Sequence, residues 1–264
     1  METSNALRRT RRRVVKKIGG RILWSLEKII EKGSKVPNTP FLDAKDFPWV
    51  RQLEENWRVM QAEVRGVLKR SGDIPGFQDI SRDQLVLTDD DRWKTFFLYG
   101  MGYRLDANCA LCPETTRLVS QIPGMTTAFF SILAPGKHIP AHRGLFKGFV
   151  RYHLGLIVPR EKEKCRIRVD DTIRHWEEGK SLLFDDTYDH EVWNETSETR
   201  VVLFVDVKRP LAPGARQLND TIIRLVRASD YVQDARRNQE AWSQALARNN
   251  AESSARPARE VHSS

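Results

Sequence analysis

The sequence predicts a mainly β protein, with an antiparallel barrel or sandwich at its centre and helices at both ends. Short strand-like runs follow one another from residue 93 to residue 207, separated by Gly, Pro or Asp turns. Helical periodicity instead dominates the residues before and after this stretch. The 264 residues, 40% of them hydrophobic, are enough for one sizeable core.

The first 32 residues predict a basic amphipathic helix. They contain ten basic and three acidic side chains, a charge of +7 out of the net +9 of the whole chain. The rest is therefore nearly neutral, and a nucleic-acid-binding surface is not indicated. Apolar residues recur every fourth position, as expected of one helix face: Val14, Ile18, Ile22, Leu26 and Ile30.

Two interpretations of this helix remain open. Residues 8–30 could lie on an anionic membrane as a peripheral contact, or their apolar face could pack on the folded domain. A membrane span would need roughly 18–20 consecutive apolar residues, and no run approaches that length. Glu27 and Lys28 interrupt the apolar part, and no cleavage site follows, which is unlike a signal peptide.

Residues 33–92 are expected to form a helical extension. Residues 34–40 read as a linker because two prolines and small polar residues occur together. A helix is predicted over residues 47–69, with its buried stripe formed by Val50, Leu53, Trp57, Met60, Val64 and Leu68.

Residues 93–210 are expected to form the β domain. Its predicted strands are 93–100, 126–133, 150–158, 165–169, 181–184 and 200–207, with a helix at 113–121. Helical periodicity returns over 219–247, within a C-terminal helical segment at 211–248. Residues 249–264 are polar and predict a disordered tail.

The cysteines indicate a reducing compartment. The chain has three, an odd number that does not fit a disulfide framework, so we expect a cytoplasmic protein. If the N-terminal helix binds lipid, the protein would be peripheral on the inner face of the membrane. Cys109 and Cys112 have C-x-x-C spacing, but a structural zinc site needs a second pair, which favours ordinary packing.

Histidines and arginines recur in a pattern that indicates a metal site with an anionic ligand. His142 and His190 are each followed about one strand later by an arginine, Arg151 and Arg200. Imidazoles suit Fe(II), and guanidinium groups suit carboxylates. Strand alternation would place Arg151 and His153 on one face. Alternatively, Arg151 pairs with Asp185 or Asp186, and Arg200 is exposed at the start of its strand.

Seven ordered blocks over roughly residues 93–210 resemble the aspartyl/asparaginyl β-hydroxylase family. The resemblance also includes Trp93-Lys94-Thr95 upstream of them. Because the blocks keep their order over nearly half of the chain, the match is far more specific than any single motif. They are Phe130-Ser131-x-Leu133-x-Pro135-Gly136, His142, Arg151-x-His153-Leu154-Gly155-Leu156-x-x-Pro159, Trp176-x-x-Gly179-Lys180, Phe184-Asp185-Asp186, His190-Glu191-Val192-Trp193 and Arg200-x-x-Leu203-x-x-Asp206-Val207.

The resemblance implies a double-stranded β-helix (jelly-roll or cupin-like) that uses Fe(II), 2-oxoglutarate and O2. It implies His142 and His190 as metal ligands and catalytic residues. Ser131 and Arg200 match the residues that hold the distal carboxylate of 2-oxoglutarate, and Arg151 and His153 match further residues of that site. Gly144 stands where the wider oxygenase superfamily has a carboxylate ligand, as in this family.

Three functions follow as hypotheses. The first is hydroxylation of an sp3 carbon in the acyl chain of a membrane lipid, because bacterial members that resemble this chain include lipid hydroxylases and residues 8–30 could bind a membrane. The second is β-hydroxylation of Asp or Asn in a peptide or protein. The third is a non-catalytic β-helix binding module, which retention of both histidines and both arginines disfavours.

Overall fold

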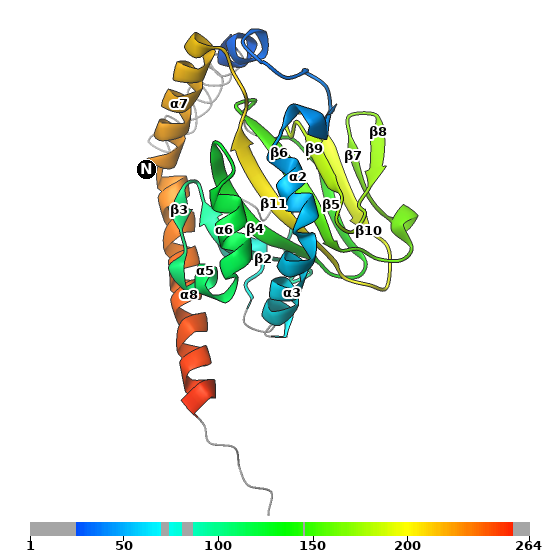
Figure 1. Ribbon diagram of the computed structural model, residues 1–264, viewed down its shortest axis with the longest axis vertical. Coiled ribbons are helices and arrows are strands. Elements are labelled where there is room, and N and C mark those ends of the chain that lie inside the picture. Colours follow the sequence, from blue (N-terminus) through cyan, green and yellow to red (C-terminus); the bar gives the residue numbers. More distant parts are fainter. Residues whose placement is uncertain (1–24, 70–73, 81–86, 145, 256–264) are drawn as a thin grey trace, which may run out of the picture.

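The structure is a computed structural model that describes residues 25–69, 74–80, 87–144 and 146–255 (Figure 1). The strands are β1 (Phe41–Leu42), β2 (Trp93–Gly100), β3 (Tyr103–Arg104), β4 (Met125–Leu133), β5 (Lys137–His142), β6 (Phe149–Ile157), β7 (Cys165–Val169), β8 (Thr172–His175), β9 (Ser181–Phe184), β10 (His190–Asn194) and β11 (Arg200–Lys208). The helices are η1 (Ala44–Asp46), α2 (Val50–Glu55), α3 (Trp57–Leu68), α4 (Phe77–Ile80), α5 (Asp106–Leu111), α6 (Pro113–Ser120), η4 (Lys162–Lys164), α7 (Pro213–Arg227) and α8 (Asp230–Ala255).

Two antiparallel sheets face each other. The larger has the order β1-β9-β6-β11-β4-β2-β3, and the smaller has the order β5-β10-β7-β8. From β4 to β11 the chain passes repeatedly between the two sheets, so that strands distant in sequence become neighbours. This topology is a double-stranded β-helix, and the predicted fold class is confirmed.

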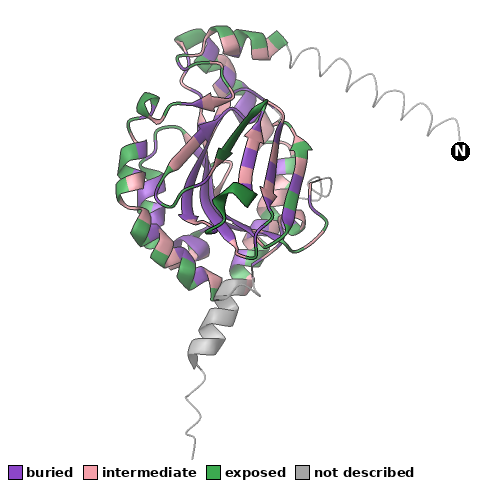
Figure 2. Ribbon diagram, turned by 90° about the vertical axis from the view of Figure 1, so that its right-hand side faces the viewer, coloured by how far each residue is buried: buried purple, intermediate pink, exposed green. Residues whose placement is uncertain are grey.

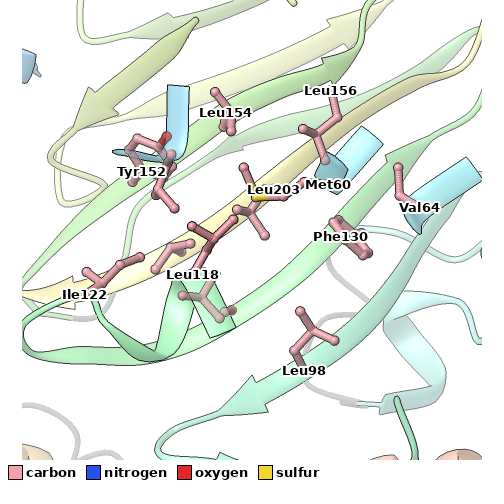
Figure 3. Close-up of a cluster of buried hydrophobic side chains, with 14 of the residues drawn as sticks. Met60, Val64, Leu98, Leu118, Ile122, Phe130, Tyr152, Leu154, Leu156 and Leu203 are labelled. Carbon is pink, nitrogen blue, oxygen red and sulfur yellow. The ribbon is translucent and has the colours of Figure 1, made fainter. Parts of the chain in front are cut away.

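Helices cover the outer face of the larger sheet. Apolar side chains of α2, α3, α5 and α6 meet the outward side chains of β2, β4, β6 and β11 in one buried cluster (Figure 3). Buried residues follow most of the strands, with the exposed β8 as an exception, whereas exposed residues colour the outward sides of the helices (Figure 2). The C-x-x-C cysteines lie in this cluster as buried free thiols, in agreement with the packing interpretation.

The space between the sheets positions the candidate site. Along β11, Leu203 and Val205 join the helix-covered cluster, whereas Val202 joins a second cluster between the sheets. Because side chains alternate along a strand, Arg200 and Phe204 share the inner face with Val202. The alternation predicted from the sequence therefore brings the arginine into the barrel.

Two predicted helices are divided differently in the structure. The helix expected over 47–69 is two helices, because Asn56 interrupts it and donates from Nδ2 to the Gln52 carbonyl. The C-terminal segment begins at Pro213, earlier than the predicted periodicity, and is broken between α7 and α8. Helix α8 continues to Ala255, past residue 249, where the sequence predicts a disordered tail.

Only the end of the N-terminal helical segment is described. Residues 25–32 are helical, and Ile30 is completely buried in a cluster with Leu211, Ala215 and Ile222. This part packs on α7, as one of the two sequence interpretations expects. Residues 8–24 of this segment lie outside the described residues. In the described part of the chain, no helix is long and apolar enough to cross a membrane.

Candidate functional site

The two predicted metal ligands are brought together at one end of the smaller sheet. His142 ends β5 and His190 begins β10, and the strand register makes them direct partners. Their ring centroids are 4.1 Å apart. Nδ1 of His142 lies 2.8 Å from the Pro140 carbonyl, and Nδ1 of His190 lies 3.0 Å from the Tyr188 carbonyl. Each carbonyl can fix the tautomer in which Nε2 has a free lone pair.

Burial keeps both imidazoles neutral. Desolvation is the main cause that lowers the pKa of His142, and it lowers the pKa of His190 to about 3. The neutral form is the one that binds metal ions, so the pair suits a first-row transition metal. Among the described residues, no cluster of three or more His, Cys, Asp or Glu side chains could hold a metal ion.

Gly144 is required by the packing of its neighbour Asp186. A Cβ atom added at Gly144 would overlap the Asp186 carboxylate, and the Gly144 amide donates to the Asp186 carbonyl at 2.7 Å. A carboxylate ligand therefore cannot stand at position 144 without displacing Asp186. The structure thereby accounts for the residue type that the sequence shows at this position.

Arg200 is a buried cation without an anionic partner in the described structure. The side chain is 1% exposed, and its Nε and Nη1 atoms have no hydrogen-bond acceptor. Its guanidinium lies over the Trp176 ring at 4.6 Å. Burial lowers the pKa of Arg200 to about 10. The alternative of an exposed Arg200 is wrong, because its position on the inner face of β11 carries it between the sheets.

Other polar atoms near Arg200 also have free hydrogen-bonding capacity. Ser131 is aligned with Val202 in the strand register, next to Arg200 on the inner face. Its hydroxyl oxygen accepts from Trp93 Nε1 at 3.1 Å, so its own proton remains available for donation. The Thr95 hydroxyl, aligned with Ser131, and the Trp176 indole N–H have no partners among described atoms. Buried polar groups normally bond, so this set fits a buried carboxylate ligand.

Arg151 is already paired, unlike Arg200. Its guanidinium bonds to Asp206 at 2.9 Å and to Asp186 at 3.0 Å, and it lies over the Phe204 ring. The alternative in which Arg151 pairs with Asp185 or Asp186 is thus correct for Asp186. Asp206 faces Arg151 directly across the β6–β11 pair, so the charge of Arg151, unlike that of Arg200, is compensated within the described structure.

His153 projects from the inner face of β6 into the space between the sheets. It packs against Trp176, Phe184 and Phe204, and neither ring nitrogen has a partner among the described atoms. Desolvation and the nearby Arg200 lower its pKa well below the usual value. A neutral imidazole is therefore available for hydrogen bonding to a ligand between the sheets.

Sequence reasoning missed the buried ionic cluster below the histidine pair. Asp185 organises the turn before His190 by accepting from the Thr187 amide and hydroxyl. It also accepts from Lys147 at 2.8 Å and from Arg209. Lys147 and Arg209 are 62 residues apart in sequence, and only the fold shows that they converge on Asp185.

Comparison with known proteins decides the family. The family model described as "Aspartyl/Asparaginyl beta-hydroxylase" matches residues 54–210, more than half of the chain. The chain belongs to this β-hydroxylase family. The resemblance identified from its sequence blocks is confirmed, and the family makes the chain a hydroxylase.

Two relatives in the family differ in what their names say they modify. An ornithine lipid ester-linked acyl 2-hydroxylase of Rhizobium tropici is 46% identical over 221 residues, which cover 84% of this chain and 78% of that protein. Human aspartyl/asparaginyl β-hydroxylase is 34% identical over 174 residues, 64% of this chain and 22% of that protein. The chain thus spans about a fifth of the human relative.

Solved structures with similar backbones include a cupin 2 conserved barrel domain protein from Salinispora arenicola. It is 14% identical, and the match covers 53% of this chain and 92% of that protein, with a TM-score of 0.31.

Proposed function

We propose that this β-hydroxylase family member is an Fe(II)- and 2-oxoglutarate-dependent dioxygenase that hydroxylates an acyl chain of a membrane lipid. The observation that carries the proposal is the buried Arg200, which has no anionic partner among the described residues, on the inner face of a barrel whose rim holds two neutral histidines. A buried cation without a carboxylate costs stability, which a dianionic co-substrate would offset.

The residues present fit both groups. His142 and His190 would supply two imidazole ligands, and the remaining positions on the metal would be open to co-substrate and oxygen. Arg200 and the Ser131 hydroxyl would hold the distal carboxylate of 2-oxoglutarate by charge-assisted hydrogen bonds. His153 would donate or accept one hydrogen bond near the same ligand.

The bound metal and co-substrate would supply the oxidising power: O2 oxidises 2-oxoglutarate to succinate and CO2, and the second oxygen atom enters the substrate C–H bond. The chain's own contribution is ligation, orientation and exclusion of water. Arg151 would contribute mainly as a fixed part of the site wall, because Asp186 and Asp206 hold its guanidinium over the Phe204 ring.

A lipid substrate is favoured by the relative from Rhizobium tropici, whose match extends over most of both proteins. The described surface adds exposed apolar residues on the 25–32 helix and on α7: Ile29 is 50% exposed and Leu225 is 69% exposed. Arg216 and Arg224 are exposed on the same helix. These features are typical of a surface that meets anionic lipid, so we propose a cytoplasmic protein peripheral to the inner membrane face.

The test measures hydroxylation directly. The purified chain is incubated with Fe(II), 2-oxoglutarate and mixed bacterial lipids, and succinate and lipid mass are recorded. We expect a lipid product 16 Da heavier, whose formation requires both Fe(II) and 2-oxoglutarate. His190→Ala should abolish succinate formation, whereas His138→Ala should not, because His138 is half-exposed and its Nε2 bonds to Glu191.

Other outcomes separate the remaining hypotheses. Hydroxylation of Asp or Asn peptides but not of lipids would establish the peptide function instead. Normal succinate formation by His190→Ala would contradict the metal assignment. Absence of binding of both Fe(II) and 2-oxoglutarate to the wild-type chain would support a non-catalytic binding module.

A further inference from the structure

A cavity of about 300 Å³ is lined in part by residues that directly follow His142 and closely precede His190 in sequence. One wall is the 25–32 helix, which contributes Glu27 and Glu31. The facing wall consists of residues beside the two histidines in sequence, including Arg143 and Tyr188. The cavity therefore joins the N-terminal helix to the rim where the metal ligands lie.

The acidic wall is held in place by packing on the other side of its helix. Ile30 is buried and Leu26 is half-buried against the α7 cluster. Glu27 and Glu31 are four residues apart and share a helix face. Lys28 bonds to Glu31 at 3.1 Å, but no cation of the described chain lies within ion-pair distance of Glu27. Burial is the main cause that raises the pKa of Glu27, and the charges of Lys147 and Arg143 offset this only in part.

The basic wall has one cation with free donors. Lys147 is bonded to Asp185 and lies 4.9 Å from the centre of the Tyr188 ring, so its charge is already compensated. Arg143 donates from Nε to the Thr187 carbonyl at 2.8 Å, which orients the guanidinium. Its two terminal nitrogens have no acceptor among the described residues, and they remain available to a ligand.

A carboxylate and a guanidinium thus face one cavity without pairing with each other. A ligand with one ammonium and one carboxylate would satisfy both, whereas a phosphate would meet the acidic wall unfavourably. We propose that this cavity binds the zwitterionic amino-acid headgroup of a lipid, with Glu27 receiving its ammonium and Arg143 its carboxylate.

This assignment rests on the proposed lipid function and makes it more specific. Arg143 directly follows His142, so a headgroup bound here would keep the first carbons of an attached acyl chain close to the histidine pair. The 25–32 helix then has a function in substrate selection, because it supplies the acidic half of the headgroup site.

The test measures binding of a short-chain N-acyl-ornithine to the purified full-length chain by calorimetry, below the concentration at which the lipid forms micelles. Two derivatives remove one charge each: the acetylated side-chain amine and the carboxylate methyl ester. The variants are Glu27→Gln and Arg143→Gln. Glu163→Gln, on η4 before β7 and at the other end of the smaller sheet from the histidines, is the control.

We expect Glu27→Gln to weaken binding of the zwitterionic lipid by about tenfold, the effect of one charge-assisted hydrogen bond. It should leave binding of the acetylated lipid unchanged. Arg143→Gln should weaken binding of the zwitterionic lipid to a similar extent and leave binding of the methyl ester unchanged. Glu163→Gln should have no effect on binding. Glu27→Asp, which retains the charge, should restore part of the lost affinity.

The assignment is wrong if the wild-type chain binds both derivatives as tightly as the zwitterionic lipid, or binds none of the three. It is also wrong if Glu27→Gln weakens binding of the acetylated lipid as much as it weakens binding of the zwitterionic lipid. Hydroxylation is measured separately. Charge-dependent binding without hydroxylation would contradict the proposed function alone, and lipid hydroxylation without charge-dependent binding would contradict the headgroup site alone.

Discussion

The Arg200 guanidinium carries a buried positive charge that no carboxylate among the described residues compensates. Because its charge is buried without an anion, replacing it with an apolar residue of similar length removes a desolvation cost. Arg200→Met should therefore raise the unfolding free energy of the ligand-free protein by on the order of 1 kcal/mol. Urea unfolding with and without 2-oxoglutarate measures this, and the co-substrate should protect only the wild type.

Arg200→Lys separates charge from geometry at the same position. Lysine keeps a positive charge but cannot form two parallel hydrogen bonds to a carboxylate, so affinity for 2-oxoglutarate should fall by about tenfold or more. Calorimetric titration with 2-oxoglutarate measures the loss. If the variant is strongly destabilised yet binds with wild-type affinity in its folded fraction, Arg200 is a structural residue.

Asp186 should make stability depend on pH. Burial, the main cause, and the nearby Asp206 and Asp185 raise its pKa from 3.8 to about 6, despite Arg151. An acid with a raised folded pKa contributes stability below its unfolded pKa and loses that contribution as pH rises through its folded pKa. Wild-type stability relative to Asp186→Asn should therefore fall between pH 4.5 and 7.5, by on the order of 2 kcal/mol.

Urea unfolding of both proteins at the two pH values checks this prediction. Taking the difference between wild type and variant removes the contribution of other titrating groups that the substitution leaves unchanged. An equal change in both proteins would show that Asp186 keeps an ordinary pKa. The Asp186→Asn variant also loses the ion pair to Arg151, which changes its unfolding free energy at both pH values. The sign of the change in relative stability between the two pH values stays the same.

At the scale of elements, one side chain fixes the 25–32 helix on α7. Ile30 is completely buried in their common cluster, whereas its neighbour Ile29 is half exposed. Ile30→Ala should cost about 2–5 kcal/mol, the range for a buried isoleucine truncated to alanine, unless the helix detaches first. Ile29→Ala should cost less than about 0.5 kcal/mol. Thermal unfolding and limited proteolysis near residue 33 distinguish the two variants.

The docking of this helix changes how the membrane hypothesis is tested. Leu26 is half-buried against the α7 cluster, so a charge at Leu26 would disturb the fold as well as any membrane contact. The exposed Ile29 and the basic residues before it are the better positions for substitution. Both interpretations use the apolar face that includes Leu26 and Ile30, and in residues 25–32 this face packs on α7, which leaves Ile29 as the exposed apolar residue of this part.

For the whole molecule, we expect reversible binding to anionic vesicles. Each basic side chain at such a surface contributes about 1 kcal/mol, so replacing Arg11, Arg12 and Arg13 with Gln should weaken binding by about a hundredfold. Replacing Arg160, Lys162 and Lys164, which flank or form η4, removes the same charge as a control. Vesicle sedimentation at low and high salt measures both. Equal losses for the two triple variants would indicate unspecific attraction rather than an N-terminal contact.

The sequence by itself determined the parts of this protein that depend on local pattern. Period-two alternation located β6 and β11 and the faces of Arg151 and Arg200, because side-chain direction in a strand is fixed by covalent geometry. Ordered motif blocks determined the family and the fold class. The break at Asn56 was not visible, because a residue that weakens a helix ends it only where its side chain finds a partner.

Only the tertiary structure decided which charges are paired. Arg151 and Arg200 each follow a metal-ligand candidate by about one strand in sequence. Arg151 is nevertheless bonded to two carboxylates, whereas Arg200 is bonded to none among the described residues. That difference depends on which strands become neighbours, since Asp206 reaches Arg151 across the β6–β11 ladder. Likewise, the cavity beside the histidines joins residues more than 100 positions apart, and no local pattern encodes such a distance in space.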